Sequence, residues 1–413
     1  MTQKRCIFVT LLLILMASQS FAGGPVYSRF GLGDLYYFAG SRSYAMGGAG
    51  VALIGDGFIN RLNPAGIAGI TSTRFSGTFE FSNYNSTDAT GSARYARGDF
   101  GGLSVAIPIS KDYGVSLFGE LTPYSTVNFA ITKDDNQLGI SSTEQFYGSG
   151  GISRLDVGSS VALTDRVHLG FKVNYLVGSI LETTTMTFTD NTYTNNELTL
   201  SDHYSGLLYT IGGTIEGLGG IIDSPLFKPL VLGFVIETPA ALDLREERFA
   251  LTAQTYDTTS TRYGTSDIPL FVAVGASYTV ADRFVLAADI SVQDWSNAKS
   301  LGVHPPELRN SFRAGGGCEI LPKKDADSYF GHVIYRAGFC YNSGNLQINN
   351  QAINGMFVTA GLGLPIGVES HLNIGLQYGV SGTTQNGLQK DNIFRLTVSI
   401  SGSELWFIRL QEE

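Results

Sequence analysis

The sequence is poor in charged residues. Only 15% of its 413 residues are Asp, Glu, Lys or Arg, against about 25% in ordinary soluble domains. Without Lys4 and Arg5, which belong to a removable leader, 25 basic (27 − 2) and 36 acidic residues remain, a net charge of −11 (25 − 36). This negative balance disfavours nucleic acid as a partner. Low charge combined with 51 glycines and 11% aromatic residues suits strands that meet lipid on one side.

Cysteine and histidine are also scarce. Cys6 lies in the leader, and we expect Cys318 and Cys340 on opposite faces of adjacent strands, which disfavours a disulfide between them. The five histidines form no HExxH or other metal-ligand spacing, and neither a Gly-x-Ser-x-Gly elbow nor a Walker-type loop occurs. A barrel lipase whose triad meets only in space stays an alternative, but we expect no enzyme activity, metal or cofactor.

Long apolar runs are missing except at the start of the chain. Lys4 and Arg5 precede the apolar run Cys6–Met16, and Ser20-Phe21-Ala22 forms a small-residue cleavage site. We therefore predict a signal peptide over residues 1–22, because this run is too short to span a membrane as a helix. No other stretch has 18 or more apolar residues, so no transmembrane helix is expected.

What the sequence does contain is strand after strand with a period of two. In residues 269–280 and 284–293, apolar residues alternate with small or polar ones. We predict an all-β fold, a transmembrane antiparallel β-barrel of about 14 strands, with membrane lipid as a partner. The predicted strands are 73–85, 99–109, 113–123, 144–163, 167–188, 198–214, 228–242, 269–280, 284–294, 311–320, 332–341, 356–364, 371–380 and 392–401.

The connections between these strands alternate in length. Residues 110–112, 164–166 and 281–282 are short turns, whereas polar stretches such as 84–98, 122–143 and 243–268 are predicted to be long loops. Short turns on one side and long loops on the other are typical of barrels in the outer membrane of a Gram-negative bacterium, the expected location. A secreted soluble β-sandwich or propeller is the alternative, but an apolar face on every strand opposite a charged face argues against it.

Ionisable side chains lie on the predicted inward faces of the strands. Lipid would make such groups costly, so we expect them to point into the lumen. Ion pairs that fill the lumen, some of them tying a plug to the wall, are the simplest interpretation; binding of a ligand head group by one or two of them is the alternative. The residues are Arg74, Glu80, Glu120, Arg154, Asp156, His168, Lys172, Glu237, Asp289, Arg313, Glu319, Arg336 and Arg395.

Residues 23–70 do not fit the barrel wall. They include an apolar cluster between Phe30 and Phe38, and a Gly- and Ala-rich stretch, residues 41–70, without strand alternation. A barrel of this size has a lumen too wide for its own side chains to fill. We therefore predict three parts: the signal peptide over 1–22, an N-terminal hatch over 23–70 that plugs the lumen, and the barrel over 71–413. A disordered tail is the alternative, which the apolar content disfavours.

One motif in the hatch resembles a known family. The stretch SYAMGGAGVAL is followed by Asp56 and then by Asn63, Pro64, Ala65 and Gly66 just before the first strand. This order resembles the FadL/TodX family of outer-membrane transporters for hydrophobic compounds. The resemblance implies an N-terminal hatch, capture of ligand on the outer loops, an apolar pocket beside the hatch and a lateral gap at a kink in the third strand, facing the Asn-Pro-Ala segment.

Candidate site residues follow from this resemblance. The hatch motif is Asn63, Pro64, Ala65 and Gly66. The ligand-pocket candidates are Val26, Tyr27, Phe30, Leu32, Leu35, Tyr36 and Phe38; the lateral-gap candidates are Gly119 and Pro123; the outer-loop capture candidates are Phe188, Leu198, Leu244, Phe249 and Leu251.

The function expected from the resemblance is passive uptake of a hydrophobic small molecule. Ligand would pass the hatch and leave by the lateral gap, and a plugged barrel can do this as a monomer. Two other functions stay open. The first is a barrel of the same type that binds or escorts secreted proteins at the outer membrane, and the second is a structural or adhesive barrel.

Overall fold

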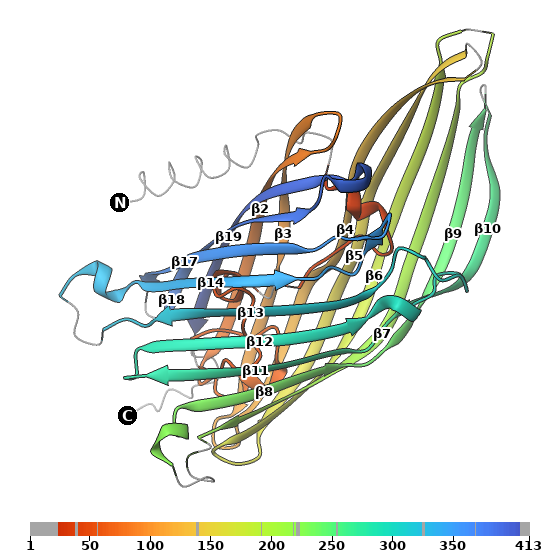
Figure 1. The fold of residues 1–413 in the computed structure, drawn as a ribbon. Helices are drawn as coiled ribbons and strands as arrows, with labels where there is room; N and C mark the ends of the chain where they lie inside the picture. Colours follow the sequence, from red (N-terminus) through yellow and green to blue (C-terminus); the bar gives the residue numbers. More distant parts are fainter. Residues whose placement is uncertain are drawn as a thin grey trace, which may run out of the picture.

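Fourteen antiparallel strands close into a barrel in the computed structural model (Figure 1). The structure describes residues 24–404 except 38–39, 56, 138–139, 191, 218, 220–223, 253–254, 324–326 and 368. The barrel closes where the last strand pairs with the first along its whole length. The strands are β2 (Thr73–Thr87), β3 (Ser92–Ser110), β4 (Val115–Gln137), β5 (Ile140–Ala162), β6 (Val167–Phe188), β7 (Asn196–Glu216), β8 (Leu230–Glu237) with β9 (Ala240–Thr252), β10 (Thr255–Ile268) with β11 (Phe271–Val280), β12 (Phe284–Asp294), β13 (Asn310–Ile320), β14 (Ile334–Asn342), β17 (Gly355–Gly367), β18 (Ser370–Gly382) and β19 (Lys390–Glu404).

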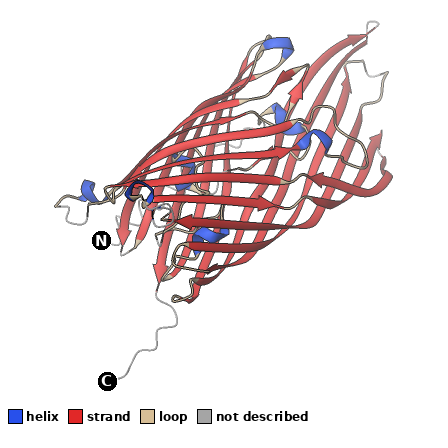
Figure 2. Ribbon diagram, turned by 60° about the horizontal axis from the view of Figure 1, so that its bottom comes forward, coloured by secondary structure: helices blue, strands red, loops and turns tan. Residues whose placement is uncertain are grey.

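Two of the fourteen strands are interrupted once. β8 and β9 both pair with β7, β11 pairs with β8, and β10 pairs with β9. Therefore β8 with β9 forms one strand of the barrel, and β10 with β11 forms the next. Figure 2 shows that the helices are short compared with the strands. The helices are η1 (Val26–Arg29), α2 (Ser41–Ala45), η2 (Pro64–Ile67), η3 (Pro225–Phe227), η4 (Trp295–Asn297), η5 (Tyr329–His332) and η6 (Gln385–Gly387). The remaining short strands are β1 (Asp34–Leu35), β15 (Gln347–Ile348) and β16 (Gln351–Ala352).

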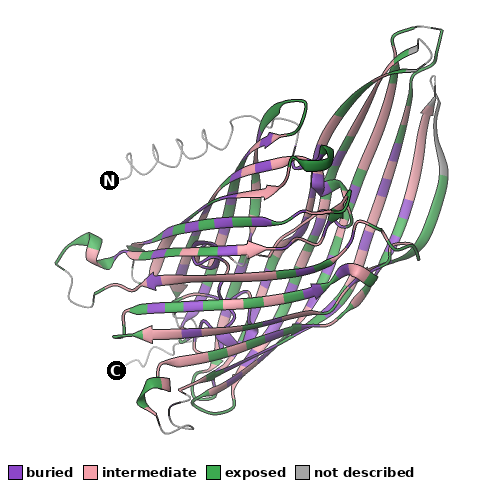
Figure 3. Cartoon of the chain, in the orientation of Figure 1, coloured by how far each residue is buried: buried purple, intermediate pink, exposed green. Residues whose placement is uncertain are grey.

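The barrel wall alternates between an apolar outer face and a polar inner face. Figure 3 shows buried and exposed positions following one another along the strands. Phe234 and Leu286 are among the exposed apolar side chains, whereas Glu237 and Glu319 are buried. Closure pairs the backbone of the lipid-facing wall, which a membrane span requires. The predicted transmembrane β-barrel is therefore confirmed, and no helix in the described ranges is long and apolar enough to span a membrane.

The two ends of the barrel differ. Short turns at one end, here called the inner end, join β3 to β4 and β11 to β12, as predicted. At the other end, here called the outer end, the predicted loops 84–98, 122–143 and 243–268 are wrong, because most of their described residues continue the strands into long hairpins. The outer ends of these stretches lack apolar alternation because they extend beyond the lipid, yet their many Thr and Tyr residues still favour strand conformation. Figure 1 shows the longest hairpins rising far above the opposite rim.

The N-terminal residues lie inside the barrel as two parts. Residues 24–37, here called the strap, lie in the outer half and contact β4. The described residues of 40–70, here called the plug, fill the inner half and contact the wall at β6, β7 and β18. Met46 and Leu53 of the plug, for example, pack with Ala287 of β12. The two cysteines after the leader, Cys318 and Cys340, are free, as predicted.

Candidate functional site

An apolar core closes the outer half of the lumen. Its wall side consists of inward apolar residues of β4 to β9, such as Phe129, Leu176 and Leu242. The strap supplies Tyr27 and Leu32 to the same core. Three outer loops fold inward over it, and they contribute Trp295, Ala298, Leu308, Leu346, Ile353 and Leu388.

The predicted ligand-pocket residues fill this core. Tyr27 and Leu32 are buried in it, and Val26, Phe30 and Leu35 pack against it. Tyr36 lines a small pocket just below, and Phe38 lies outside the described residues. Together these side chains occupy the apolar space that a hydrophobic ligand would need.

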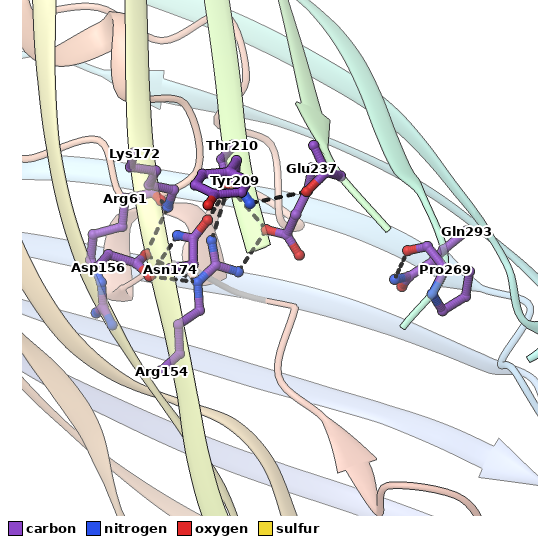
Figure 4. A network of polar contacts seen from close by, with 11 residues as sticks. Arg61, Arg154, Asp156, Lys172, Asn174, Tyr209, Thr210, Glu237, Pro269 and Gln293 are labelled. Carbon is purple, nitrogen blue, oxygen red and sulfur yellow. Dashed lines mark hydrogen bonds and ion pairs between the residues drawn. The ribbon is translucent and has the colours of Figure 1, made fainter. Parts of the chain in front are cut away.

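A layer of charged side chains lies directly below the apolar core. Arg154 of β5 contacts Asp156 at 2.8 Å and Glu237 at 2.8 Å, and Lys172 of β6 contacts Asp156 at 2.9 Å (Figure 4). Asp156 also accepts a hydrogen bond from Asn174 at 2.6 Å. Arg154, Asp156, Lys172 and Glu237 line a pocket of about 130 Å³ together with Arg61, Glu120, Asp289 and Arg313.

Other inward charges tie the plug to the wall. Arg42 of α2 donates to Glu319 of β13 at 2.6 Å, and Arg336 of β14 donates to the same carboxylate at 2.6 Å. The carboxylate of Asp289 accepts from the backbone N–H groups of Gly50 and Val51 at 2.6 and 2.8 Å. The predicted interpretation of the inward charges as lumen ion pairs agrees with these contacts.

The hatch motif is buried against β6 and β7. The side-chain amide of Asn63 donates to the carbonyl groups of Val51, Gly213 and Phe234 at 2.7, 3.2 and 3.3 Å. Its oxygen caps η2 by accepting from the N–H of Ala65 at 3.0 Å. Pro64 starts η2, and Ala65 and Gly66 follow it, all three of them buried. The motif thus joins three separate backbone segments, and wall contacts place it at β6 and β7 rather than at the third barrel strand.

The wall has a seam between β3 and β4. These strands pair only from Leu103↔Leu121 to Ser110↔Val115, although β3 begins at Ser92 and β4 ends at Gln137. Of the two lateral-gap candidates, Gly119 lies in the paired part, opposite Val105. Pro123 follows the last pair, and the register of β4 with β5 shifts beside it. Proline has no N–H to donate across a ladder, which suits the point where pairing stops.

The strap occupies this seam. Asp34 and Leu35 pair with Thr126 and Ser125 of β4. The N–H of Tyr36 donates to the carbonyl of Tyr124 at 2.9 Å. Higher on the same edge, the hydroxyl of Ser28 lies 3.2 Å from both the N and the O of Asn128. The strap therefore satisfies backbone groups of β4 that β3 leaves unpaired.

The outer-loop capture candidates lie on strands rather than in loops. Leu244 of β9 is buried in the apolar core, and Leu198 of β7 is exposed. Phe188 ends β6, where it contacts Tyr193, while Phe249 and Leu251 lie near the end of β9. The sequence reasoning missed the three inward-folding loops. The only signal was a few apolar residues, such as Trp295 and Leu308, in otherwise polar stretches.

The site offers packing and hydrogen bonding more than catalysis. In the described part of the chain, no three His, Cys, Asp or Glu side chains group as a metal site would require. The arrangement consists of an apolar core that includes the strap, a layer of charged side chains below it, and a seam at the side.

Comparison with known proteins gives a family and a fold. The BamG family model matches residues 1–411, and a search of curated proteins finds no match. Similar solved structures are a Pseudomonas aeruginosa FadL homologue (TM-score 0.60, 13% identity, 89% of this chain and 98% of that chain) and the toluene transporters TodX of P. putida (0.57, 16%, 89% and 99%) and TbuX of Ralstonia pickettii (0.59, 15%, 89% and 98%). None of the three is described as an enzyme.

These similarities confirm the resemblance in fold to the FadL/TodX proteins that the hatch motif predicts. Because the sequence identity is this low, the similarity shows a shared fold and nothing further. The BamG model, by contrast, matches the chain over nearly its whole length. The chain belongs to the BamG family.

Proposed function

We propose that this protein is an outer-membrane barrel for passive uptake of hydrophobic small molecules, with the strap as the gate of a lateral route. The observation that carries the proposal is the seam: β3 and β4 separate above Leu121, and residues 24–37 fill the space instead of a strand. The strap pairs with β4 through the two ladder residues Asp34 and Leu35, and the N–H of Tyr36 adds one bond, so displacement of the strap breaks few backbone bonds. The toluene transporters of the same fold support the choice of substrate class.

Displacement of the strap would open an apolar chamber. The groups around its side chains are Phe129, Ile152, Leu176 and Leu208 of the wall, with Trp295 from an outer loop. Burial of apolar surface is worth about 25 cal/mol per Å², so a hydrocarbon would enter from water without an energy source. The chamber opens at the seam onto the membrane.

The charged layer determines the direction of exit. Arg154, Asp156, Lys172 and Glu237 close the chamber toward the inner half of the lumen. An apolar molecule that passed between them would separate ion pairs and leave charges unpaired at a cost of several kcal/mol. The way through the seam into lipid is the less costly path for such a ligand.

A reversible lock of the strap tests this proposal. Leu35 and Ser125 are Cα partners, so Leu35→Cys with Ser125→Cys, in a background where Cys318 and Cys340 are replaced by Ser, allows a disulfide. Purified barrel in liposomes is given toluene or a medium-chain fatty acid, and uptake is measured before and after reduction. We expect uptake in the reduced form and at least a tenfold loss in the oxidised form.

The matched control joins two wall strands away from the strap. Asn83 and Ala96 are Cα partners on β2 and β3, and a disulfide between cysteines at these positions should leave uptake unchanged. Equal uptake by the locked and reduced strap variants would contradict the gate. Uptake no faster than in empty liposomes by the reduced protein would contradict transport itself.

A second candidate function is protein binding outside the membrane. The observation that favours it is the set of long hairpins at the outer end, which carry charged side chains on both faces and so extend into water. A protein-escorting barrel is therefore the function to test if uptake is absent.

A further inference from the structure

The hairpins of the outer end form a free-standing sheet. This outer wall consists of residues 126–137, 140–150, 179–188, 196–205, 240–252 and 255–268, in the spatial order β4, β5, β6, β7, β9 and β10. Figure 1 shows it rising beyond the rest of the rim, with β10 as its outermost strand.

Charged residues on both faces place the outer wall in water. On one face, Glu246 of β9 lies opposite Asp202 of β7 and Arg262 of β10. On the other face, Arg245 of β9 lies opposite His203 of β7 and contacts Glu247 at 3.6 Å. Neither face suits lipid, so the wall is available to other macromolecules outside the cell.

The two edges of the outer wall differ. Above the strap, the β4 edge carries Lys133, Asp134 and Asp135, and Lys133 is 59% exposed. Charged side chains, Lys in particular, are a common protection of an edge strand against pairing with another chain. The β4 edge is protected in this way.

The β10 edge carries neither lysine nor proline, and among residues 260–264 its one charged side chain is Arg262. In the described part of the chain, residues from Ser260 to Gly264 pair with β9 and with no second strand. A loop covers the edge from Thr265 downward, where the N–H of Leu301 donates to the Thr265 carbonyl, and the Leu301 side chain lies beside Gly264. Tyr263 is 78% exposed. An exposed strand edge without proline or lysine is a template for an added strand.

Arg262 gives this edge a charge preference. Its Nε and Nη2 donate to the carboxylate of Glu246 at 2.7 Å each. Within the described residues, no partner is present for Nη1, and the side chain is 50% exposed. A carboxylate on an added strand opposite Arg262 would accept from Nη1, because a guanidinium has five donors and can serve two acceptors.

We propose that the β10 edge, residues 260–264, binds an extended segment of another protein at the cell surface by strand addition, with Asp or Glu opposite Arg262. Backbone hydrogen bonds to the edge supply the affinity, and the charge at Arg262 sets the register. The proposal concerns protein binding and is independent of whether the barrel transports small molecules.

A synthetic strand tests the proposal. The probe is a ten-residue peptide of alternating Thr and Val with one central Glu, labelled for fluorescence anisotropy with the full-length barrel in detergent. We expect saturable binding, and none by the same peptide with every backbone N–H methylated. Arg262→Gln should weaken binding of the Glu peptide roughly tenfold, as expected for loss of one charge-assisted bond, and leave binding of the corresponding Gln peptide unchanged.

Lys133→Gln is the matched control, since it also removes an exposed cation from an edge of the same wall. Equal binding of the methylated peptide would overturn the proposal, as would an equal loss in the Lys133→Gln variant. Sedimentation of the barrel alone provides one more check. A dimer that Arg262→Gln dissociates would assign the edge to a second copy of this chain and overturn the proposal of a different partner.

Discussion

The hydroxyl of Tyr27 forms hydrogen bonds with both backbone polar groups of Gln389, a residue 362 positions away. It donates to the carbonyl at 2.5 Å and accepts from the N–H at 3.0 Å. Gln389 lies in the loop between β18 and β19, on the β3 side of the seam, whereas Ser28 contacts Asn128 on the β4 side. The start of the strap therefore connects β4 with the β18–β19 loop across the seam.

Tyr27→Phe tests this bridge. The change keeps the ring in the apolar core but leaves two backbone groups of Gln389 without their partner, which costs about 1–3 kcal/mol. We expect residues 24–36 to exchange amide hydrogens faster, measured by mass spectrometry. Tyr113→Phe, at a residue that is 69% exposed, is the control and should change nothing. Unaltered exchange in the Tyr27 variant would show that the strap is held elsewhere.

Glu319→Gln tests the attachment of the plug. Glu319 is 1% exposed and pairs with Arg42 and Arg336. Loss of its charge leaves two largely buried guanidinium groups without a carboxylate, and breaking a buried pair costs about 3–5 kcal/mol. We expect a fall in the temperature at which the barrel changes from its folded to its unfolded mobility in a gel. Asp282→Asn, in an exposed turn with φ of 53° that Asn tolerates, should migrate as the unaltered protein does, and an equal fall there would refute the specific role of Glu319.

Asn63→Asp tests the hatch motif. The variant keeps the oxygen that caps η2 but loses the amide donors to Val51, Gly213 and Phe234. Each hydrogen bond lost costs about 1 kcal/mol, and a buried carboxylate facing carbonyl oxygens adds to this. We expect faster trypsin cleavage after Arg61 with an intact barrel. The control Asn83→Asp, at an exposed position of β2, should leave cleavage unchanged.

Gly170→Val tests whether the plug can be displaced from the wall. A Cβ at Gly170 would lie 2.4 Å from the carbonyl carbon of Pro64 and 2.5 Å from the nitrogen of Ala65. The strand can keep its ladder, so we expect the plug to move and ion conductance in planar bilayers to rise. At Gly98 a Cβ meets nothing within 4 Å, and Gly98→Val should conduct as the unaltered protein does. Equal conductance of both variants would mean that the wall yields instead of the plug.

The barrel could be predicted from the sequence because its signal is local. A strand such as β12 shows the period of two within ten residues, and lipid forces every strand to repeat it. The same signal failed at 122–143 and 243–268, since strands that extend into water need no apolar face. There the preference of Thr and Tyr for extended backbone was the only cue.

The hatch could be predicted only in part. The composition of residues 41–70 and the motif from Asn63 to Gly66 indicated a plug, and the charges on inward faces indicated partners for it. The filling of the apolar core by Tyr27 and Leu32 could not be predicted, because their partners come from strands and loops more than 90 residues away along the chain.

The sequence by itself determined that the chain forms a lipid-facing barrel with a polar interior, because alternation and the cost of charge in lipid act on each strand separately. Only the tertiary structure decided that β3 and β4 part above Leu121, that the strap closes this seam, and that β10 keeps a free edge. These features depend on which strands lack a partner, and pairing between distant segments is a property of the assembled barrel.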